Sequence, residues 1–285
     1  MRIARALAAA VLLAVAMPVA AAPADVATTT HVTDGLALFG ALEQGGVARG
    51  QLPTGAQALT LDGKPVATSA DGRFLIGFGR DAGPAAVLAW HDARGAAATR
   101  SLVIAARQWR IQSLPTLPPH PVPDAEFEAR RPGEVALIAA ARAPISTQTG
   151  WAGSFVAPAI GPVTGVYGSQ RILAGTPSAP HAGIDFGARP GSPVVAPAAG
   201  IVRLAQGPFT LEGNLVMIDH GLGLVSAFLH LSRIDVKPGD IVTQGQQIGA
   251  VGATGRATGP HLHWGVTWTD VRIDPATLLS APQLK

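Results

Sequence analysis

Glycine and proline interrupt this chain so often that long regular helices are disfavoured. The 285 residues include 34 glycines and 24 prolines, and both residue types destabilise the interior of a helix. Asp-Gly pairs at residues 34–35, 62–63 and 71–72 separate short apolar runs, and such pairs are typical of tight β-hairpin turns. We therefore expect a mainly β protein, built from short strands joined by many turns.

The composition excludes several classes of protein. With 48% hydrophobic and 14% charged residues, the chain does not have the composition of a disordered protein. The net charge is only +3, and no basic run is interleaved with aromatic residues, so we expect no nucleic-acid partner. The chain contains no cysteine. A metal site must therefore use histidines and carboxylates as ligands, and disulfides contribute nothing to stability.

The first residues have the pattern of an export signal. Arg2 and Arg5 precede an apolar stretch over residues 6–17, and small residues follow at 19–21. The stretch is too short to span a bilayer, so a cleavable signal peptide over residues 1–21 is favoured over an anchor helix. Because no lipobox cysteine follows, we expect no stable membrane anchor. The expected location is the periplasm.

The remaining chain divides into two β-rich domains joined by a linker. Residues 22–112 predict an N-terminal small β-sandwich-like domain, and residues 113–149 predict a proline-rich linker with a helical segment. Pro132 and Gly133 interrupt this segment, so it predicts two short helices or one kinked helix. Residues 150–285 form the second domain. Its predicted strands cover residues 193–196, 200–204, 215–218, 224–231 and 241–243.

Histidines in the second domain recur at even spacings. His181 and Asp185 are four residues apart, and His261 and His263 are two apart. On a strand, an even separation places two side chains on one face. The apolar residues between them, such as Leu262, then point into the core. Gly183, between the first pair, leaves open space over the face.

A third candidate strand carries His230. There Ser226, Phe228 and His230 alternate with Ala227, Leu229 and Leu231, so the pattern predicts that the first three share the functional face. His220 follows a strand at a turn, and we assign it a structural role.

This combination of groups is suited to a catalytic zinc ion. Such sites use three protein ligands and leave a fourth position for water, and histidine with a carboxylate is a familiar ligand set. Histidines that are not ligands can then serve as a general base and as a hydrogen-bond donor to the tetrahedral intermediate.

The second domain resembles the M23 (LytM/lysostaphin-like) zinc metallopeptidases, which act as peptidoglycan endopeptidases. The motifs that carry the resemblance include His181-Ala-Gly-Ile-Asp185, Phe228-Leu-His-Leu-Ser232, and Gly252-Ala-Thr-Gly255 leading into Gly259-Pro-His-Leu-His263. The resemblance implies a β-rich domain of the duplicated hybrid motif type with one zinc ion in a groove. It implies that His181, Asp185 and His263 are the zinc ligands. It also implies that His230 and His261 are the catalytic histidines and that peptidoglycan is the substrate.

Two other functions stay open. Some members of this family have lost their zinc ligands and act as non-catalytic regulators that bind and activate cell-wall amidases, so an amidase or another regulatory protein is a possible partner. Other members cut glycine-rich proteins outside the cell. The complete set of three ligands and two further histidines favours an enzyme.

Overall fold

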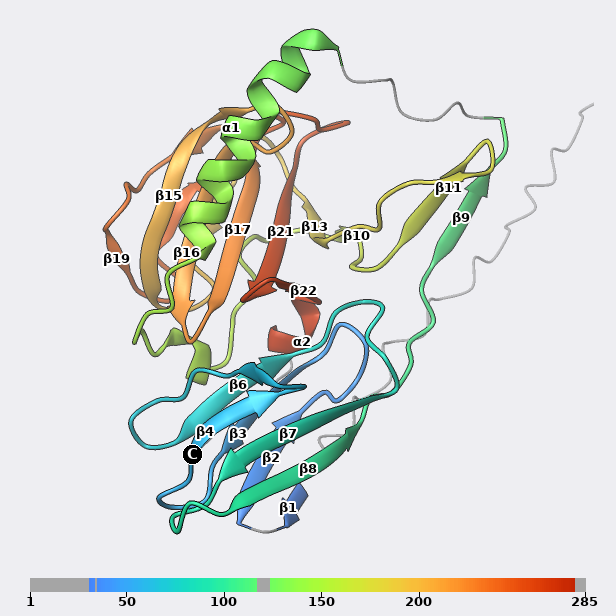
Figure 1. The fold of residues 1–285 in the computed structure, drawn as a ribbon. Coiled ribbons are helices and arrows are strands. Elements are labelled where there is room, and N and C mark those ends of the chain that lie inside the picture. The colour runs from blue at the N-terminus through green and yellow to red at the C-terminus, as the bar shows by residue number, and fades with distance from the viewer. Residues whose placement is uncertain (1–30, 34, 117–123, 280–285) are drawn as a thin grey trace, which may run out of the picture.

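The computed structural model describes residues 31–33, 35–116 and 124–279. The predicted signal peptide and part of the proline-rich linker, residues 117–123, lie outside the described residues. The prediction of a mainly β protein is confirmed, because strands dominate both halves of the chain (Figure 1). Among the described residues, no helix is long and apolar enough to cross a membrane.

Residues 31–103 form two four-stranded antiparallel sheets. The first has the order β1 (His31–Thr33), β2 (Leu36–Gly40), β3 (Val47–Gln51), β6 (Arg73–Gly77), and the second β5 (Lys64–Pro65), β4 (Gln57–Leu61), β7 (Ala85–His91), β8 (Ala97–Val103). Buried side chains of both sheets belong to one hydrophobic cluster. Asp62 and Gly63, which connect β4 to β5, both have positive φ angles, of 49° and 77°. A tight hairpin of type I′ requires this conformation at both positions.

The second half of the chain is built on an eight-stranded sheet. Seven strands follow the order β10 (Val163–Gly165), β13 (Gly183–Gly187), β21 (His261–Trp268), β17 (Leu224–Leu231), β16 (Gly213–Gly221), β15 (Gly200–Phe209), β19 (Ile241–Val242), and β22 (Val271–Ile273) pairs with β21. Every pairing in this sheet is antiparallel. The predicted strand over residues 224–231 is confirmed residue for residue.

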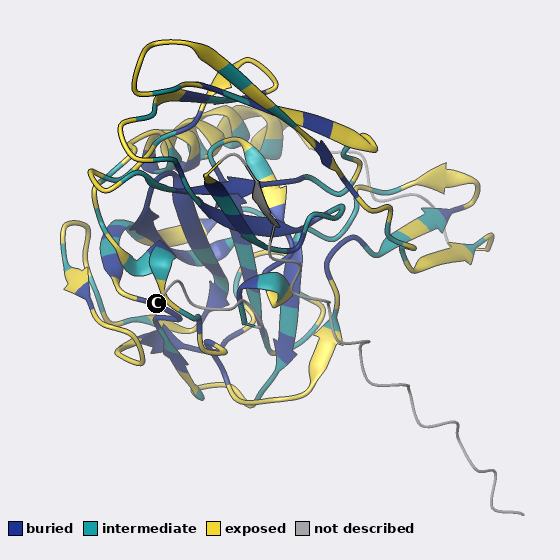
Figure 2. Ribbon diagram, turned by 90° about the horizontal axis from the view of Figure 1, so that it is seen from below, coloured by how far each residue is buried: buried dark blue, intermediate teal, exposed yellow. Residues whose placement is uncertain are grey.

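One face of this sheet is buried in the main core. Ile184, Phe228, Leu262 and Trp264 have at most 5% of their surface exposed. They belong to the same hydrophobic cluster as residues of a small sheet with the order β14 (Pro193–Val195), β20 (Gln247–Ala250), β18 (Arg233–Ile234). Figure 2 shows the burial concentrated along the long strands. The opposite face carries the histidine pairs and is called the site face below.

A three-stranded arm projects from the body of the molecule (Figures 1 and 2). It consists of β9 (Ile111–Leu114), β11 (Gln170–Leu173) and β12 (Thr176–Pro177), and β9 runs parallel to β11. Strand β9, at the end of the first half of the chain, therefore pairs with β11, which lies in the segment that leads to His181.

Helix α1 (Ala125–Arg142) lies over part of the site face (Figure 1). Asp124 caps its first turn by accepting a hydrogen bond from the Phe127 N–H at 2.8 Å. A second apolar cluster joins the helix to the sheet and contains Ile138, Ala141, Leu204, Phe209, Leu215, Met217 and Val225, with Ala227 and Leu229 packed against it. The helix therefore covers apolar surface that water would otherwise contact.

Pro132 does not divide α1, so of the two predicted outcomes the pair of short helices is wrong. Residues on both sides of Pro132 are held to the turn between β15 and β16. Arg131 donates hydrogen bonds to both carboxylate oxygens of Glu212, at 2.7 and 2.8 Å. Glu134 accepts hydrogen bonds from the backbone N–H and hydroxyl of Thr210. These tertiary contacts offset the backbone hydrogen bond that proline cannot make.

Arg49 connects the two halves of the molecule. Its side chain on β3 is almost fully buried, and it donates hydrogen bonds to the carbonyl oxygens of Trp151 and Gly153 at 2.8 and 3.1 Å. Trp151 lies in the short 3-10 helix η1 (Gly150–Ala152). A further short helix, α2 (Ala276–Leu279), follows the last strand. Burial lowers the pKa of Arg49 to about 10, so it stays charged at neutral pH.

Replacing Arg49 with alanine is expected to lower the free energy of unfolding by about 2–4 kcal/mol, because two carbonyl groups lose their buried donor. Urea unfolding of the two proteins measures this difference. Arg94→Ala, at an exposed turn, is the matched control and should change stability little. Equal unfolding midpoints for Arg49→Ala and the parent chain would show that these bonds do not stabilise the junction.

Candidate metal centre and its histidines

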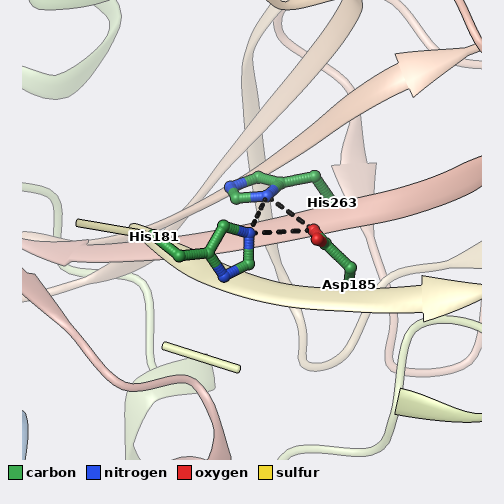
Figure 3. A group of neighbouring side chains, drawn as sticks. All are labelled: His181, Asp185 and His263. Atoms are coloured by element: carbon green, nitrogen blue, oxygen red, sulfur yellow. Dashed lines mark hydrogen bonds and ion pairs between the residues drawn. The ribbon is translucent and has the colours of Figure 1, made fainter. Parts of the chain in front are cut away.

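Three side chains converge on the site face (Figure 3). His181 Nε2 lies 3.1 Å from Asp185 Oδ1, and His263 Nδ1 lies 2.8 Å from the same oxygen. The two imidazole nitrogens are 3.1 Å apart. Each of the three residues therefore directs one potential ligand atom toward a common point.

The register of two strands produces this convergence. Asp185 on β13 lies directly opposite His263 on β21, and Gly187 lies opposite His261. Because residues at even spacing share a strand face, the two histidines of β21 point to the same side as Asp185. His181 precedes β13 and reaches the group from the loop. The prediction that Leu262 points into the core is confirmed, since it has no exposed surface.

His230 reaches the site by a route that the sequence pattern did not predict. Leu229 is opposite His263 and Phe228 is opposite Trp264, so Phe228 and Ser226 face the core. The prediction that these two residues share the functional face is wrong.

A bulge brings His230 to the site face instead. Between the pairs Asn214↔Leu231 and Val216↔Phe228, two residues of β17 oppose one residue of β16. His230 has a φ of 65°, a left-handed conformation that histidine adopts more readily than most residues. Its ring centroid lies 4.9 Å from that of His261 and 6.3 Å from that of His263. Bulges commonly redirect a side chain in this way beside active sites.

Backbone carbonyls determine which nitrogen of each ring is available. Three Nδ1–H groups donate to carbonyl oxygens: His181 to Val166 at 3.1 Å, His230 to Thr254 at 2.8 Å and His261 to Gly259 at 2.8 Å. A neutral imidazole that donates from Nδ1 has a free electron pair at Nε2. The Nε2 of His181 can therefore act as a ligand, and those of His230 and His261 can accept a proton.

The local charges favour an ionised carboxylate at the centre. Burial raises the pKa of Asp185, but hydrogen bonds and charge from His181 and His263 outweigh it, so this pKa is held well below its usual range. Burial also lowers the pKa of His181, yet its interactions with Asp185 raise the net value. For His230 and His263, burial dominates and lowers the pKa. Both favour the neutral form, which can bind a metal or accept a proton.

The donor set fits a divalent transition metal. Two imidazole nitrogens and one carboxylate oxygen are the ligands of many catalytic zinc sites. The Nδ1–H of His181 donates to a carbonyl, the outer contact that usually orients such ligands. Among the described residues, His181, Asp185 and His263 are the one group of three or more metal-ligating side chains with mutually close ligand atoms.

His220 is separate from this group. Its ring is fully buried, and its nitrogens lie 2.8 Å from the Ala199 carbonyl and 2.9 Å from the Ser226 hydroxyl. Burial lowers its pKa to about 4. A neutral, doubly hydrogen-bonded ring agrees with a structural role.

The sequence interpretation missed the groups that position these histidines. The carbonyls of Val166, Thr254 and Gly259 come from loops that flank the strands, and their role depends on backbone geometry and not on side-chain type. The only sequence signal was their closeness to glycine, as in Gly252-Ala-Thr-Gly255.

Comparison with known proteins gives consistent matches. Residues 179–275 match the sequence model of peptidase family M23. The peptidoglycan DD-endopeptidase ShyA of Vibrio cholerae is 47% identical over 87 residues, which are 30% of this chain and 20% of that protein. The DD-carboxypeptidase/endopeptidase Mpg of Neisseria meningitidis is 40% identical over 105 residues, which are 36% of this chain and 24% of that protein.

A solved structure extends the likeness beyond the matched domain. A crystal structure from Pseudomonas aeruginosa, described as a peptidase M23, has a TM-score of 0.63 and 31% sequence identity, and the match covers 85% of this chain and 96% of that chain. The matches to the two curated relatives span only about a fifth to a quarter of those proteins' length.

Proposed function

Because the chain belongs to peptidase family M23, we propose that it is a zinc-dependent endopeptidase that hydrolyses peptide cross-links in peptidoglycan. The observation that carries this proposal is the convergence of His181, Asp185 and His263, with two further histidines whose Nε2 atoms are free. That arrangement provides both a metal site and proton-transfer groups. Relatives named as peptidoglycan DD-endopeptidases support peptidoglycan as the substrate.

The proposed location is the periplasm. The basic residues and short apolar stretch before residue 22 support export. Peptidoglycan is then in reach of the mature protein. A regulatory protein partner, such as an amidase, stays a prediction.

In the proposed mechanism, a zinc ion would be held by His181 Nε2, Asp185 Oδ1 and His263 Nδ1. When bound, zinc lowers the pKa of a water molecule and polarises the scissile carbonyl. Asp185 stays ionised beside both imidazoles and keeps them in place. The Nε2 of His230 or His261 accepts a proton from the attacking water. The other ring, when protonated at Nε2, would donate a hydrogen bond to the oxygen on which negative charge develops, and the proton taken from water would pass to the nitrogen of the scissile bond as the C–N bond breaks. The carbonyls of Thr254 and Gly259 keep both rings in the orientation that this requires.

Digestion of purified peptidoglycan sacculi tests the proposed activity. The zinc-loaded protein is expected to convert cross-linked dimers to monomers, and a chelator should abolish this conversion because it removes the metal. Mass spectrometry of the released muropeptides measures the products. Adding zinc back to the chelated sample is the control and should restore the products. Chelator-resistant cleavage would contradict a metal-dependent mechanism.

The same experiment separates the enzyme from a regulator. A regulator would release no products alone, even with one zinc bound per chain, and would increase release when a cell-wall amidase is added. The complete set of donors and free histidines favours products without a partner. Glycine-rich peptides are tested as a second substrate. If they are cleaved and sacculi are not, the enzyme acts on glycine-rich proteins and not on peptidoglycan.

A further inference from the structure

A cavity of about 110 Å³ adjoins the metal centre beneath α1. His263 forms one side of it, and Gly265, two residues further along β21, forms part of its floor. Gly265 pairs with Ala227 on β17 and with Gly183 on β13. Gly265 and Ala227 line the cavity and carry little or no side chain, so space remains over the sheet next to His263, whereas the space over Gly183 is filled by the Trp264 carbonyl and the His263 ring. The volume exceeds the roughly 30 Å³ that one water molecule occupies in the liquid.

Two arginines from different elements line this cavity. Arg142 comes from the last turn of α1, and Arg272 comes from β22. In the described part of the chain, Arg142 Nε is buried and has no hydrogen-bond partner, and the same is true of Thr267 Oγ1. Thr267 also lines the cavity. Buried polar groups without partners are uncommon and costly, so both atoms are positions where a ligand or an ordered water molecule would bind.

The charges around the cavity are unbalanced. Burial lowers the pKa of Arg142, the positive charge of Arg272 lowers it further, and the charge of Glu212 acts in the opposite direction. Glu212 also lines the cavity and compensates part of this positive charge, but both of its carboxylate oxygens accept hydrogen bonds from Arg131. Arg142 and Arg272 thus line one cavity, and the Glu212 carboxylate beside them is already bonded to Arg131. An anion is the ligand that such a site would take.

Arg272 also borders a second cavity. This larger hollow, of about 400 Å³, is lined by His181, Arg80 and Tyr167 and shares Ala182 and Arg272 with the first. One cavity therefore borders the histidine ligand His263, and the other borders His181. Arg272 lies between them. A ligand held by this arginine would occupy hollows that border both histidine ligands.

We propose that Arg142 and Arg272 bind a free carboxylate of the peptide substrate, on the residue that supplies the nitrogen of the scissile bond. The inference rests on the proposed peptidase function and names its substrate class. Guanidinium groups pair with carboxylates through two parallel hydrogen bonds, which makes them selective for this group. Such a carboxylate is two covalent bonds from the scissile nitrogen. Internal bonds of a polyglycine chain lack it, so the site favours cross-links in which the carbon next to the scissile nitrogen carries a free carboxylate over glycine-rich peptides.

A pair of peptides that differ in one group tests this site. The probes are N-acetyl-L-lysyl-D-alanyl-D-alanine and its C-terminal amide. Calorimetry uses the full zinc-loaded chain with His261→Ala, so that neither peptide is consumed. The acid is expected to bind about tenfold more tightly than the amide, the factor for charge-assisted hydrogen bonds. Arg142→Gln and Arg272→Gln, each added to this chain, should weaken binding of the acid to the level of the amide.

Matched variants make the result specific. Arg130→Gln alters an exposed arginine on the same helix and should keep the preference for the acid. Arg272 is exposed, so Arg272→Glu should fold normally and reverse the preference. Circular dichroism melting checks that each variant is folded. Equal binding of acid and amide by the chain with both arginines would overturn the proposal.

The outcome is independent of the activity assay. If sacculi are cut but acid and amide bind equally, the carboxylate site is wrong and the peptidase function stands. If the acid is preferred but no sacculi are cut, the site is supported and the proposed peptidase function fails.

Discussion

Replacing His181 with alanine is expected to release the bound zinc and reduce hydrolysis of sacculi to the level of a chelated sample. Among the described residues, His181 Nε2 is one of three donor atoms that converge at the centre, and catalytic zinc sites typically use three protein ligands. Loss of an outer contact to a ligand already weakens metal binding by about 10- to 100-fold, so loss of the ligand itself should weaken it by more than about 100-fold. Metal analysis after dialysis and muropeptide release measure the two effects.

His91→Ala is the matched control for this substitution. His91 is an exposed histidine on β7 in the first half of the chain. Its replacement should leave zinc content and activity unchanged. A His181→Ala protein that retains one zinc ion per chain and full activity would refute the ligand assignment.

His230→Ala is expected to have a different effect: the protein keeps its zinc and loses turnover. His230 is not among the three converging donors, and its Nδ1–H is bonded to the Thr254 carbonyl. Its Nε2 is therefore available for proton transfer, which typically contributes about 10²- to 10⁴-fold to a rate. We expect kcat to fall by about that factor, with zinc content unchanged. Zinc analysis and the rate of muropeptide release check both parts.

The backbone at this position calls for a second variant. His230 has a positive φ, and alanine is strained in that conformation. Asparagine tolerates it better, so His230→Asn separates loss of the imidazole from backbone strain. Both variants should be inactive and zinc-bound. If His230→Ala released zinc as readily as His181→Ala, the division between ligands and proton-transfer residues would be wrong.

The mainly β class and the core face of β13 and β21 could be predicted from local pattern, whereas that of β17 could not. Glycine, proline and Asp-Gly turns limit helix length wherever they occur. The even spacing of His261 with His263 restricts this pair to one side of a strand, whereas His181 lies in the loop before β13 and reaches Asp185 from there. The restriction on His261 and His263 follows from the period of an extended chain, so it holds before any strand pairing is known.

His230 shows the limit of that reasoning. Simple alternation grouped it with Phe228 and Ser226, both of which are buried in the core. The bulge that turns His230 to the site face depends on pairing with β16, and the sequence of β17 alone does not encode that pairing. The continuous course of α1 through Pro132 has a similar origin. It depends on Arg131 and Glu134, which are held by residues about 80 positions away in the chain.

The chain's own sequence thus determined which residues can act together on a strand. The tertiary structure alone decided what surrounds them. Arg142 and Arg272 are 130 residues apart, and no local pattern relates a residue near a helix end to one in a short edge strand. They face one cavity because α1 packs on the apolar part of the site face, next to a strip of small residues. Side-chain periodicity extends only along one element, whereas charge and burial at this site come from the packing of elements distant in sequence.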